Sequence, residues 1–228
     1  MSENPLTEIR RQPSLALHER VYRALRRSII SGIYEPGQRL TEEEVAGEAG
    51  VSRTPVREAF RLLASDGFVE YSRNRGVVVI DFGVDEIWDM WRLRASLEGL
   101  AAELAAERIT GPEIDELGKL LDGMKMACEA QDWDQMTDLL MEFDDVICTS
   151  ARAQPLIAMF KSLQSITWDL RSLVHTSPMR NTVPYSDHVK IYKAICEGDG
   201  EKARRLTEDH VLQWGKVFVQ EYRKNHRC

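Results

Sequence analysis

The sequence lacks the cysteine spacing of zinc sites and disulfide frameworks. Its four cysteines are far apart, with no Cys-x-x-Cys pair, so neither a cysteine-based zinc site nor a small disulfide scaffold is expected. Scattered thiols suit a reducing compartment. The four positions are Cys128, Cys148, Cys196 and Cys228.

Long apolar runs and common catalytic motifs are also missing. No run reaches the ~18 apolar residues that span a bilayer, and the first 25 residues hold several arginines and no unbroken apolar stretch. We therefore expect a cytoplasmic protein with no membrane partner. No His-Glu-x-x-His or Gly-x-Ser-x-Gly motif occurs, so we expect that the chain is not an enzyme.

Lysine is absent from the first 80 residues, which hold 12 arginines and 11 acidic residues, a net charge of +1. Because the whole chain carries −7, the remainder carries −8. A value of +1 is far below the basic balance of most nucleic-acid-binding modules. The placement of the arginines, and not their number, must therefore indicate a partner.

Residues 15–80 predict three short helices and a hairpin. The first helix has an apolar stripe at spacings of four and stops at Gly32. Thr41 and Glu44 form a capping-box pair that starts a second helix, and Ser52 or Thr54 caps a third. The stripe consists of Leu17, Val21, Leu25 and Ile29.

Two β-like runs, "FVEYS" and "GVVVI", follow the third helix and are joined by the polar turn "RNR". Three helices and a two-stranded wing predict a winged helix-turn-helix over residues 15–80, preceded by a flexible arm, 1–14.

From residue 81 onward the pattern changes to long amphipathic segments separated by helix stops, which predicts an all-helical bundle over residues 81–228 and a mainly α fold. The predicted helices are 84–108, 112–131, 134–151, 155–174, 184–197 and 200–223.

The third helix has one charged face and one apolar face. Arg53, Arg57 and Arg61 recur every four residues, opposite an apolar stripe. Such a face is either a solvated surface or a major-groove reader, in which arginine binds guanine bidentately. The tight turn before it, the hydroxyls of Ser52 and Thr54, which suit phosphate, and the arginines of the wing tip favour DNA. The apolar stripe is Val56, Phe60 and Leu63.

The stretch "GVSRTPVREAFRLLASDGFVE…RGVVV" resembles the DNA-binding signature of the GntR family of bacterial transcription regulators. The resemblance implies operator contacts at Arg53, Thr54 and Arg57, and a wing tip at Arg75 and Gly76. Some relatives have a DNA-contacting arginine where this sequence has Glu44.

Four polar residues interrupt the inward stripes of the bundle. Arg94 shares a stripe with Ile87 and Leu97 and needs an anion, either a structural carboxylate on another helix or a bound carboxylate ligand. Asp144, His188 and His210 form either hydrogen-bonded core positions or a divalent-metal site of the zinc type.

The order of the motifs "R..LE", "ARAQPL" and "H..IYKAICEGD" resembles the helical FCD effector domain of the FadR-type branch. That resemblance implies an effector pocket at Arg94 and four metal ligands: an Asp, a His four residues later, and two further His. His188 and His210 match the last two, whereas Leu140 and Asp144 stand at the first two positions, so three ligands remain at most.

The sequence thus predicts a homodimeric regulator that reads a near-palindromic operator. The preferred hypothesis is a repressor released by a small organic-acid effector held by Arg94, Asp144, His188 and His210. Two alternatives stay open: a ligand-free bundle that only dimerises, and a metal-dependent enzyme with a DNA-binding head.

Overall fold

The computed structural model describes residues 15–72, 76–81, 83–163 and 185–225 of the 228-residue chain. The predicted arm 1–14 and Arg75 lie outside these described residues. The chain forms two compact units, and the boundary between them lies between Gly83 and Val84. Each unit has its own buried apolar residues.

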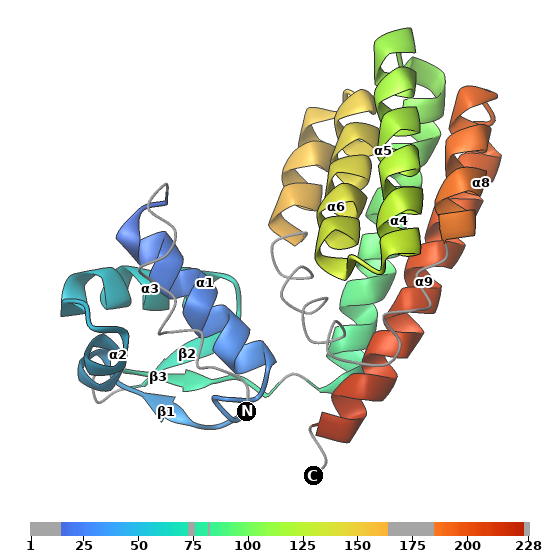
Figure 1. Cartoon of the computed structure of the whole chain (residues 1–228). Coiled ribbons are helices and arrows are strands. Elements are labelled where there is room, and N and C mark those ends of the chain that lie inside the picture. The colour runs from blue at the N-terminus through green and yellow to red at the C-terminus, as the bar shows by residue number, and fades with distance from the viewer. Residues whose placement is uncertain (1–14, 73–75, 82, 164–184, 226–228) are drawn as a thin grey trace. The chain divides into compact units, whose positions relative to one another are not determined.

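The first unit contains three helices and a small sheet (Figure 1). The predicted stripe of the first helix is confirmed for three of its members, because Val21, Leu25 and Ile29 are buried, while Leu17 at the helix start is exposed. This helix packs on the third. The elements are α1 (Leu17–Ile30), β1 (Arg39–Leu40), α2 (Glu42–Ala49), α3 (Arg53–Ser65), β2 (Val69–Ser72) and β3 (Gly76–Val79).

The helix-turn-helix is built by local capping. The Glu44 amide donates to the Thr41 hydroxyl at 3.2 Å, and the Thr41 amide donates to the Glu44 carboxylate at 3.1 Å, which confirms the predicted capping box. Gly50 ends α2 in the left-handed region, at φ 63°. Ser52 then takes the N-cap position of α3. Two helices joined by so short a turn leave one face of α3 exposed.

The wing is a three-stranded antiparallel sheet in the order β1-β3-β2. The predicted β2–β3 hairpin is confirmed, but β1 was not predicted, because a strand of two residues is too short to show alternation. A Cβ at Gly76 would lie 2.4 Å from the Leu40 carbonyl oxygen. Glycine at this position therefore lets β3 approach the end of β1.

The second unit is helical in all its described elements, and the mainly α fold class is confirmed. Residues 154–163 are also helical, and the rest of the helix predicted for 155–174 lies outside the described residues. The bounds are α4 (Val84–Arg108), α5 (Gly111–Ala130), α6 (Trp133–Ser150), α8 (Tyr185–Cys196) and α9 (Gly200–Asn225).

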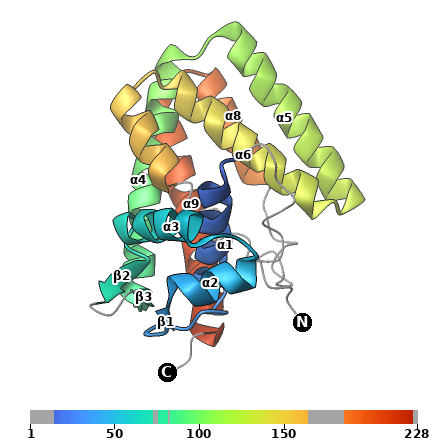
Figure 2. The ribbon, with the colours of Figure 1, turned by 90° about the vertical axis from the view of Figure 1, so that its left-hand side faces the viewer.

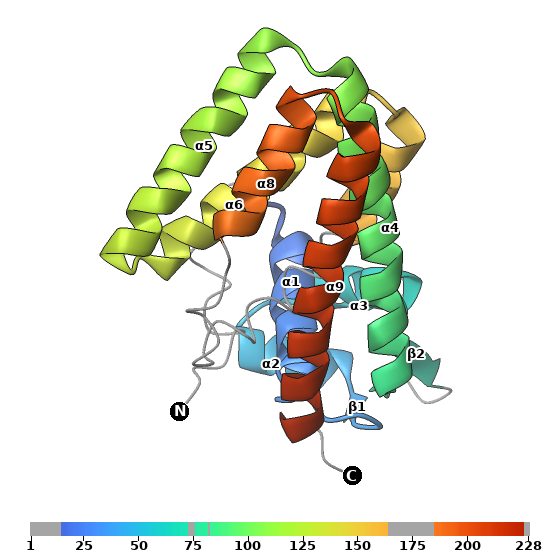
Figure 3. The same ribbon diagram turned by 90° about the vertical axis from the view of Figure 1, so that its right-hand side faces the viewer.

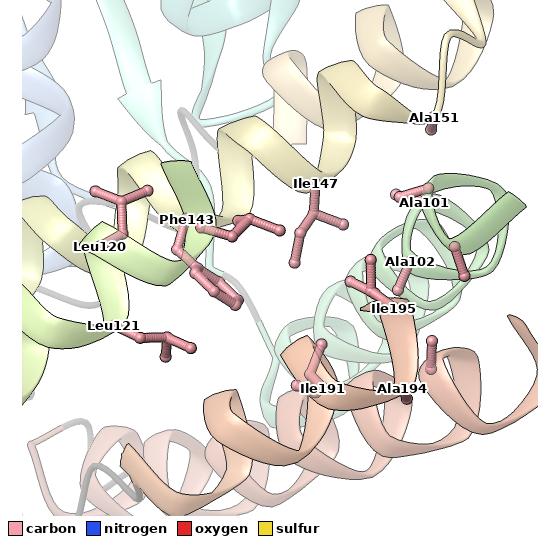
Figure 4. Close-up of a cluster of buried hydrophobic side chains, with 14 of the residues drawn as sticks. Ala101, Ala102, Leu120, Leu121, Phe143, Ile147, Ala151, Ile191, Ala194 and Ile195 are labelled. Atoms are coloured by element: carbon pink, nitrogen blue, oxygen red, sulfur yellow. The ribbon is translucent and has the colours of Figure 1, made fainter. Parts of the chain in front are cut away.

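The core of the bundle lies where α4, α5, α6 and α8 converge. α5 and α6 form a helical hairpin (Figure 2), and small side chains of α4 let the large ones of its neighbours approach. Figure 4 shows the labelled part of this cluster: Ala101, Ala102, Leu120, Leu121, Phe143, Ile147, Ala151, Ile191, Ala194 and Ile195.

Arg152, just after α6, ties this end of the bundle to the end of α4 and the start of α5. Arg152 Nη1 donates to the Arg108 carbonyl at 2.8 Å, and Arg152 Nη2 donates to the Glu113 carboxylate at 3.0 Å. Glu113 also accepts from the Thr110 amide and hydroxyl, and these hydrogen bonds lower the pKa of Glu113 to about 2. The "ARAQP" segment therefore has a structural role here.

α4 and α9 run side by side over part of their length (Figure 3), and glycines on both helices allow the close approach. A Cβ built on Gly215 of α9 would lie 2.8 Å from Cβ and Cγ of Trp91 on α4. A larger residue here would therefore force the α9 backbone or the Trp91 side chain to shift. Among the described residues, no helix combines the length and the apolar character that crossing a membrane requires.

Candidate functional site

The exposed face of α3 carries the predicted arginine row. The side chains of Arg53, Arg57 and Arg61 are 57%, 53% and 62% exposed. The opposite face is buried in the first unit, as predicted, through Val56, Phe60 and Leu63. The amphipathic pattern of α3 is therefore confirmed, and its guanidinium groups reach solvent.

Two glutamates of α2 pair with two of these arginines. Arg57 donates from Nε and Nη2 to both carboxylate oxygens of Glu42, each at 2.8 Å, and Arg53 Nη2 lies 2.8 Å from a Glu43 oxygen. The hydrogen bonds from Arg57 lower the pKa of Glu42, and Glu42 raises the pKa of Arg57. The donor fork of Arg57 is thus occupied by a carboxylate before any nucleic acid arrives.

The start of α3 presents small hydroxyls. Ser52 and Thr54 are exposed, and within the described residues the Ser52 hydroxyl makes no capping hydrogen bond. Arg61 pairs with Glu58 on its own helix at 2.8 Å. Hydroxyls and amides at the positive end of a helix are well suited to hold a phosphate.

The wing offers one feature that the sequence did not single out. Tyr71 on β2 is 59% exposed and lies opposite Val77 on β3. Strict alternation would put Tyr71 on the same face as the buried Val69, so the sequence did not indicate that this ring is exposed. Arg75 itself is outside the described residues.

The bundle buries Arg94 on α4 among carboxylates. Arg94 is 3% exposed; its Nε donates to Glu98 at 2.5 Å, and its Nη2 lies 3.5 Å from Asp144 on α6. A structural carboxylate on another helix was one of the two alternatives for Arg94, and Asp144 is such a carboxylate. Sequence reasoning missed Glu98, whose position four residues along α4 places it beside Arg94.

Two N–H donors beside this ion pair are unsatisfied. Arg94 Nη1 and Trp91 Nε1 are buried and find no hydrogen-bond partner in the described part of the chain. The guanidinium carbon of Arg94 lies 5.2 Å from the centre of the Trp91 ring, so both donors belong to one small region of α4. Sequence reasoning missed Trp91, because a tryptophan on an inward stripe is usually only core.

The two predicted histidines meet in the bundle. Their rings pack edge to face with centroids 4.5 Å apart, His188 from α8 and His210 from α9. His188 also contacts the ring of Phe143, and His210 Nδ1 lies 3.6 Å from Asp187. Both histidines are buried, and Asp187 is an acidic neighbour that the sequence did not indicate.

The predicted metal-ligand set does not form a metal-binding group. Across the described residues, no three His, Cys, Asp or Glu side chains lie together as a metal ion requires. Asp144 is instead directed toward Arg94, and Leu140 stands where the resemblance implied an Asp. In the part of the chain that the structure describes, Asp144, His188 and His210 are therefore not arranged as a metal centre.

Two family models match the chain, one for each unit. Residues 17–79 match the model described as bacterial regulatory proteins, gntR family, and residues 89–213 match the FCD domain. Together they cover the arginine row of α3, the ion pair of Arg94 and the two histidines.

Curated relatives agree with this assignment. The chain is 28% identical over 220 residues to the HTH-type transcriptional repressor RspR of Escherichia coli (strain K12), with 96% of each chain covered. It is 31% identical over 206 residues to the HTH-type transcriptional regulator McbR of the same organism, covering 88% of this chain and 91% of that protein. A shorter match, 35% over 128 residues, joins 56% of this chain to 50% of the gluconate operon transcriptional repressor of Bacillus subtilis (strain 168).

A solved structure shares the fold. The structure of E. coli McbR/YncC aligns with a TM-score of 0.70 at 24% identity, covering 91% of this chain and 99% of that one. Given the exposed arginines of α3, the winged helix-turn-helix and the two family matches, this chain belongs to the GntR family of bacterial regulatory proteins and is a DNA-binding transcription regulator whose helical part is an FCD domain.

Proposed function

We propose that this regulator is a repressor that binds a near-palindromic operator as a homodimer and leaves it when a small carboxylate binds in the bundle. The effector half depends on Arg94, a buried cation with one amino group that lacks a hydrogen-bond partner among the described residues. Two relatives that bear the name repressor support the sign of regulation.

The DNA-binding domain in this proposal is residues 15–80, with 1–14 as an arm, and the effector and dimerisation domain is 81–228. Exposed guanidinium groups on α3 support major-groove reading, and the hydroxyls at its start support phosphate binding. The proposed contacts are Ser52, Arg53, Thr54, Arg57, Arg61, Arg75 and Gly76. Because the operator would lie on the bacterial chromosome, which is in the cytoplasm, we propose that the protein acts there.

A second copy of the chain is the proposed partner protein. Leu93 and Leu100 of α4 are 50% and 37% exposed and lie seven residues apart, so they share one face of the helix. Two leucines of this kind are costly to leave in water and suit the self-complementary contact of a two-fold dimer.

The effector would bind at the polar cluster of the bundle, near Arg94, Asp144, His188 and His210. Its carboxylate would accept from Arg94 Nη1, and it would compete with Asp144, whose 3.5 Å contact is longer than that of Glu98. The effector shifts DNA binding only through a difference in its affinity for two conformations of the protein.

Metal chemistry has no part in this proposal. Some FCD domains bind metal, but Asp144 is directed to Arg94, and no metal-holding cluster occurs in the residues that the structure describes. We also assign no enzymatic turnover, in keeping with a family of transcription regulators. Metal analysis of the purified protein tests the first statement: a stoichiometric divalent metal that is lost in His188→Ala would contradict it.

A ligand-free dimerisation domain is the second candidate, favoured by the two carboxylates that already neutralise Arg94. Operator binding in a panel of small carboxylates separates the two candidates. We expect at least one acid to weaken operator binding by the wild type. Arg94→Lys keeps the charge but loses the fork, and it should need about tenfold more acid. An operator affinity that no carboxylate changes would favour the ligand-free domain.

A further inference from the structure

Trp91 presents a buried donor next to the donor of Arg94. The indole is 2% exposed, its Nε1 finds no acceptor among the described residues, and its ring lies beside the Arg94 guanidinium. The ring is held by Phe218 of α9, with ring centroids 5.8 Å apart, and by the backbone at Gly215. The position of this N–H is therefore fixed by packing.

Buried N–H groups are almost always hydrogen-bonded, because removing one from water without a new partner is costly. Here two such groups, on residues three apart along α4, share one region. Arg94 Nη1 belongs to a cation and Trp91 Nε1 to a neutral ring, so the two donors are not equivalent. A ligand that satisfies both must carry two acceptor atoms.

Charge decides what the second acceptor can be. Arg94 already faces Glu98 at 2.5 Å and Asp144 at 3.5 Å, so this region holds one more carboxylate than guanidinium. One effector carboxylate at Arg94 Nη1 would repel Asp144 from its 3.5 Å contact with Nη2 and take over as the counter-ion. A second would add a buried negative charge with no cation to neutralise it, which is costly. A hydroxyl or carbonyl oxygen satisfies an indole N–H without that cost.

We propose that Trp91 is a specificity-determining residue of the effector site, whose indole N–H binds a neutral oxygen next to the carboxylate that Arg94 binds. The ligand class is a small monocarboxylic acid with a hydroxyl or oxo group close to its carboxylate. This inference rests on the proposed carboxylate effector and adds a rule about which carboxylates are accepted.

Titration calorimetry with three small acids tests the rule. Lactate has the neutral oxygen, propionate lacks it, and malonate replaces it with a second carboxylate. We expect the wild type to bind lactate about 5–10-fold more tightly than propionate, the effect of one hydrogen bond to a donor that is otherwise unsatisfied, and to bind malonate more weakly than lactate.

The variants separate the role of Trp91 from that of Arg94. Trp91→Phe keeps an aromatic ring but loses the N–H, and it should bind lactate as weakly as propionate while its propionate affinity stays unchanged. Trp88→Phe, a half-buried tryptophan of the same helix, is the matched control and should keep the preference. Asp144→Asn should strengthen the binding of all three acids by removing a competing charge.

A lactate preference that survives in Trp91→Phe overturns the inference. If all three acids bind, show no preference and weaken in Arg94→Lys, Trp91 has no such role but the carboxylate effector stands. If none binds to the wild type at millimolar concentration, the inference is overturned, and release from operator DNA in the wider panel decides separately on the proposed function.

Discussion

Replacing Glu42 by Gln should strengthen DNA binding, whereas replacing Arg57 by Ala should weaken it. Both residues lie outside the hydrophobic core, and they are joined by two hydrogen bonds of 2.8 Å. The same two donors of Arg57 would be needed to bind guanine O6 and N7 in the major groove. Arg57 must therefore leave Glu42 before it can read a base.

The magnitudes follow from the exposure of the pair. An exposed ion pair contributes about 0.2–1 kcal/mol, and a bidentate base contact contributes about 1–3 kcal/mol. The wild type breaks the first to make the second, so Arg57→Ala should lose about 1–2 kcal/mol, roughly 5–30-fold in operator affinity. Glu42→Gln should gain up to about fivefold, because it removes both the competing pair and a negative charge.

The assay is a fluorescence titration against an operator obtained by in vitro selection and against random-sequence DNA, at two salt concentrations. Glu107→Gln, an exposed glutamate of α4, removes the same charge outside the DNA-binding unit and is the control. An equal loss on both DNAs in Arg57→Ala would mean that Arg57 binds phosphate and not a base. No loss on either DNA would refute the assignment of α3 as the reading helix.

Three further predictions concern the folded chain. Gly215→Ala should lower the free energy of unfolding by about 1–3 kcal/mol, because the new methyl would lie 2.8 Å from Cγ of the Trp91 ring. Gly47→Ala has open space around its Cβ and should raise the free energy of unfolding by about 0.4–1 kcal/mol. Chemical denaturation measures both changes. The carboxylate of Glu113 has a pKa lowered from 4.5 to about 2. Its contribution to the free energy of unfolding is therefore complete above pH 4.5 and is lost as the pH falls toward 2. The difference in free energy of unfolding between the wild type and Glu113→Gln should vanish over that range, and a difference that stays constant would contradict the pairing. Leu93→Glu with Leu100→Glu should give a monomer in light scattering with unchanged helix content, and a persistent dimer would place the interface elsewhere.

The helices and the reading face were predictable because their signals are local. The capping pair of Thr41 and Glu44 and the stripe opposite Arg57 depend on spacing along one segment, and spacing is visible in a sequence. β1 was not predictable, because two residues cannot show a period, and its partner in the described sheet is β3, far along the chain.

The inward position of the polar residues in the bundle was also predicted, but their partners were not. The apolar stripe indicates that Arg94 faces inward, but it does not indicate that Asp144 of another helix lies 3.5 Å from Arg94. Such choices depend on how several helices approach one another. The ion pairs of the arginines on α3 with α2 are a similar case, since they join two elements across a turn.

The backbone-to-ring contact between Gly215 and Trp91 has a mechanical consequence for signalling. Glycine has no side chain that could rotate away, so a ring displaced by a few tenths of an ångström must push the main chain of α9 itself. Movement at this point is transmitted to a helix of 26 residues as a rigid body instead of being absorbed by rotamers. If the proposed effector binds beside α4 and displaces this ring, the expected result is a displacement of the C-terminal helix.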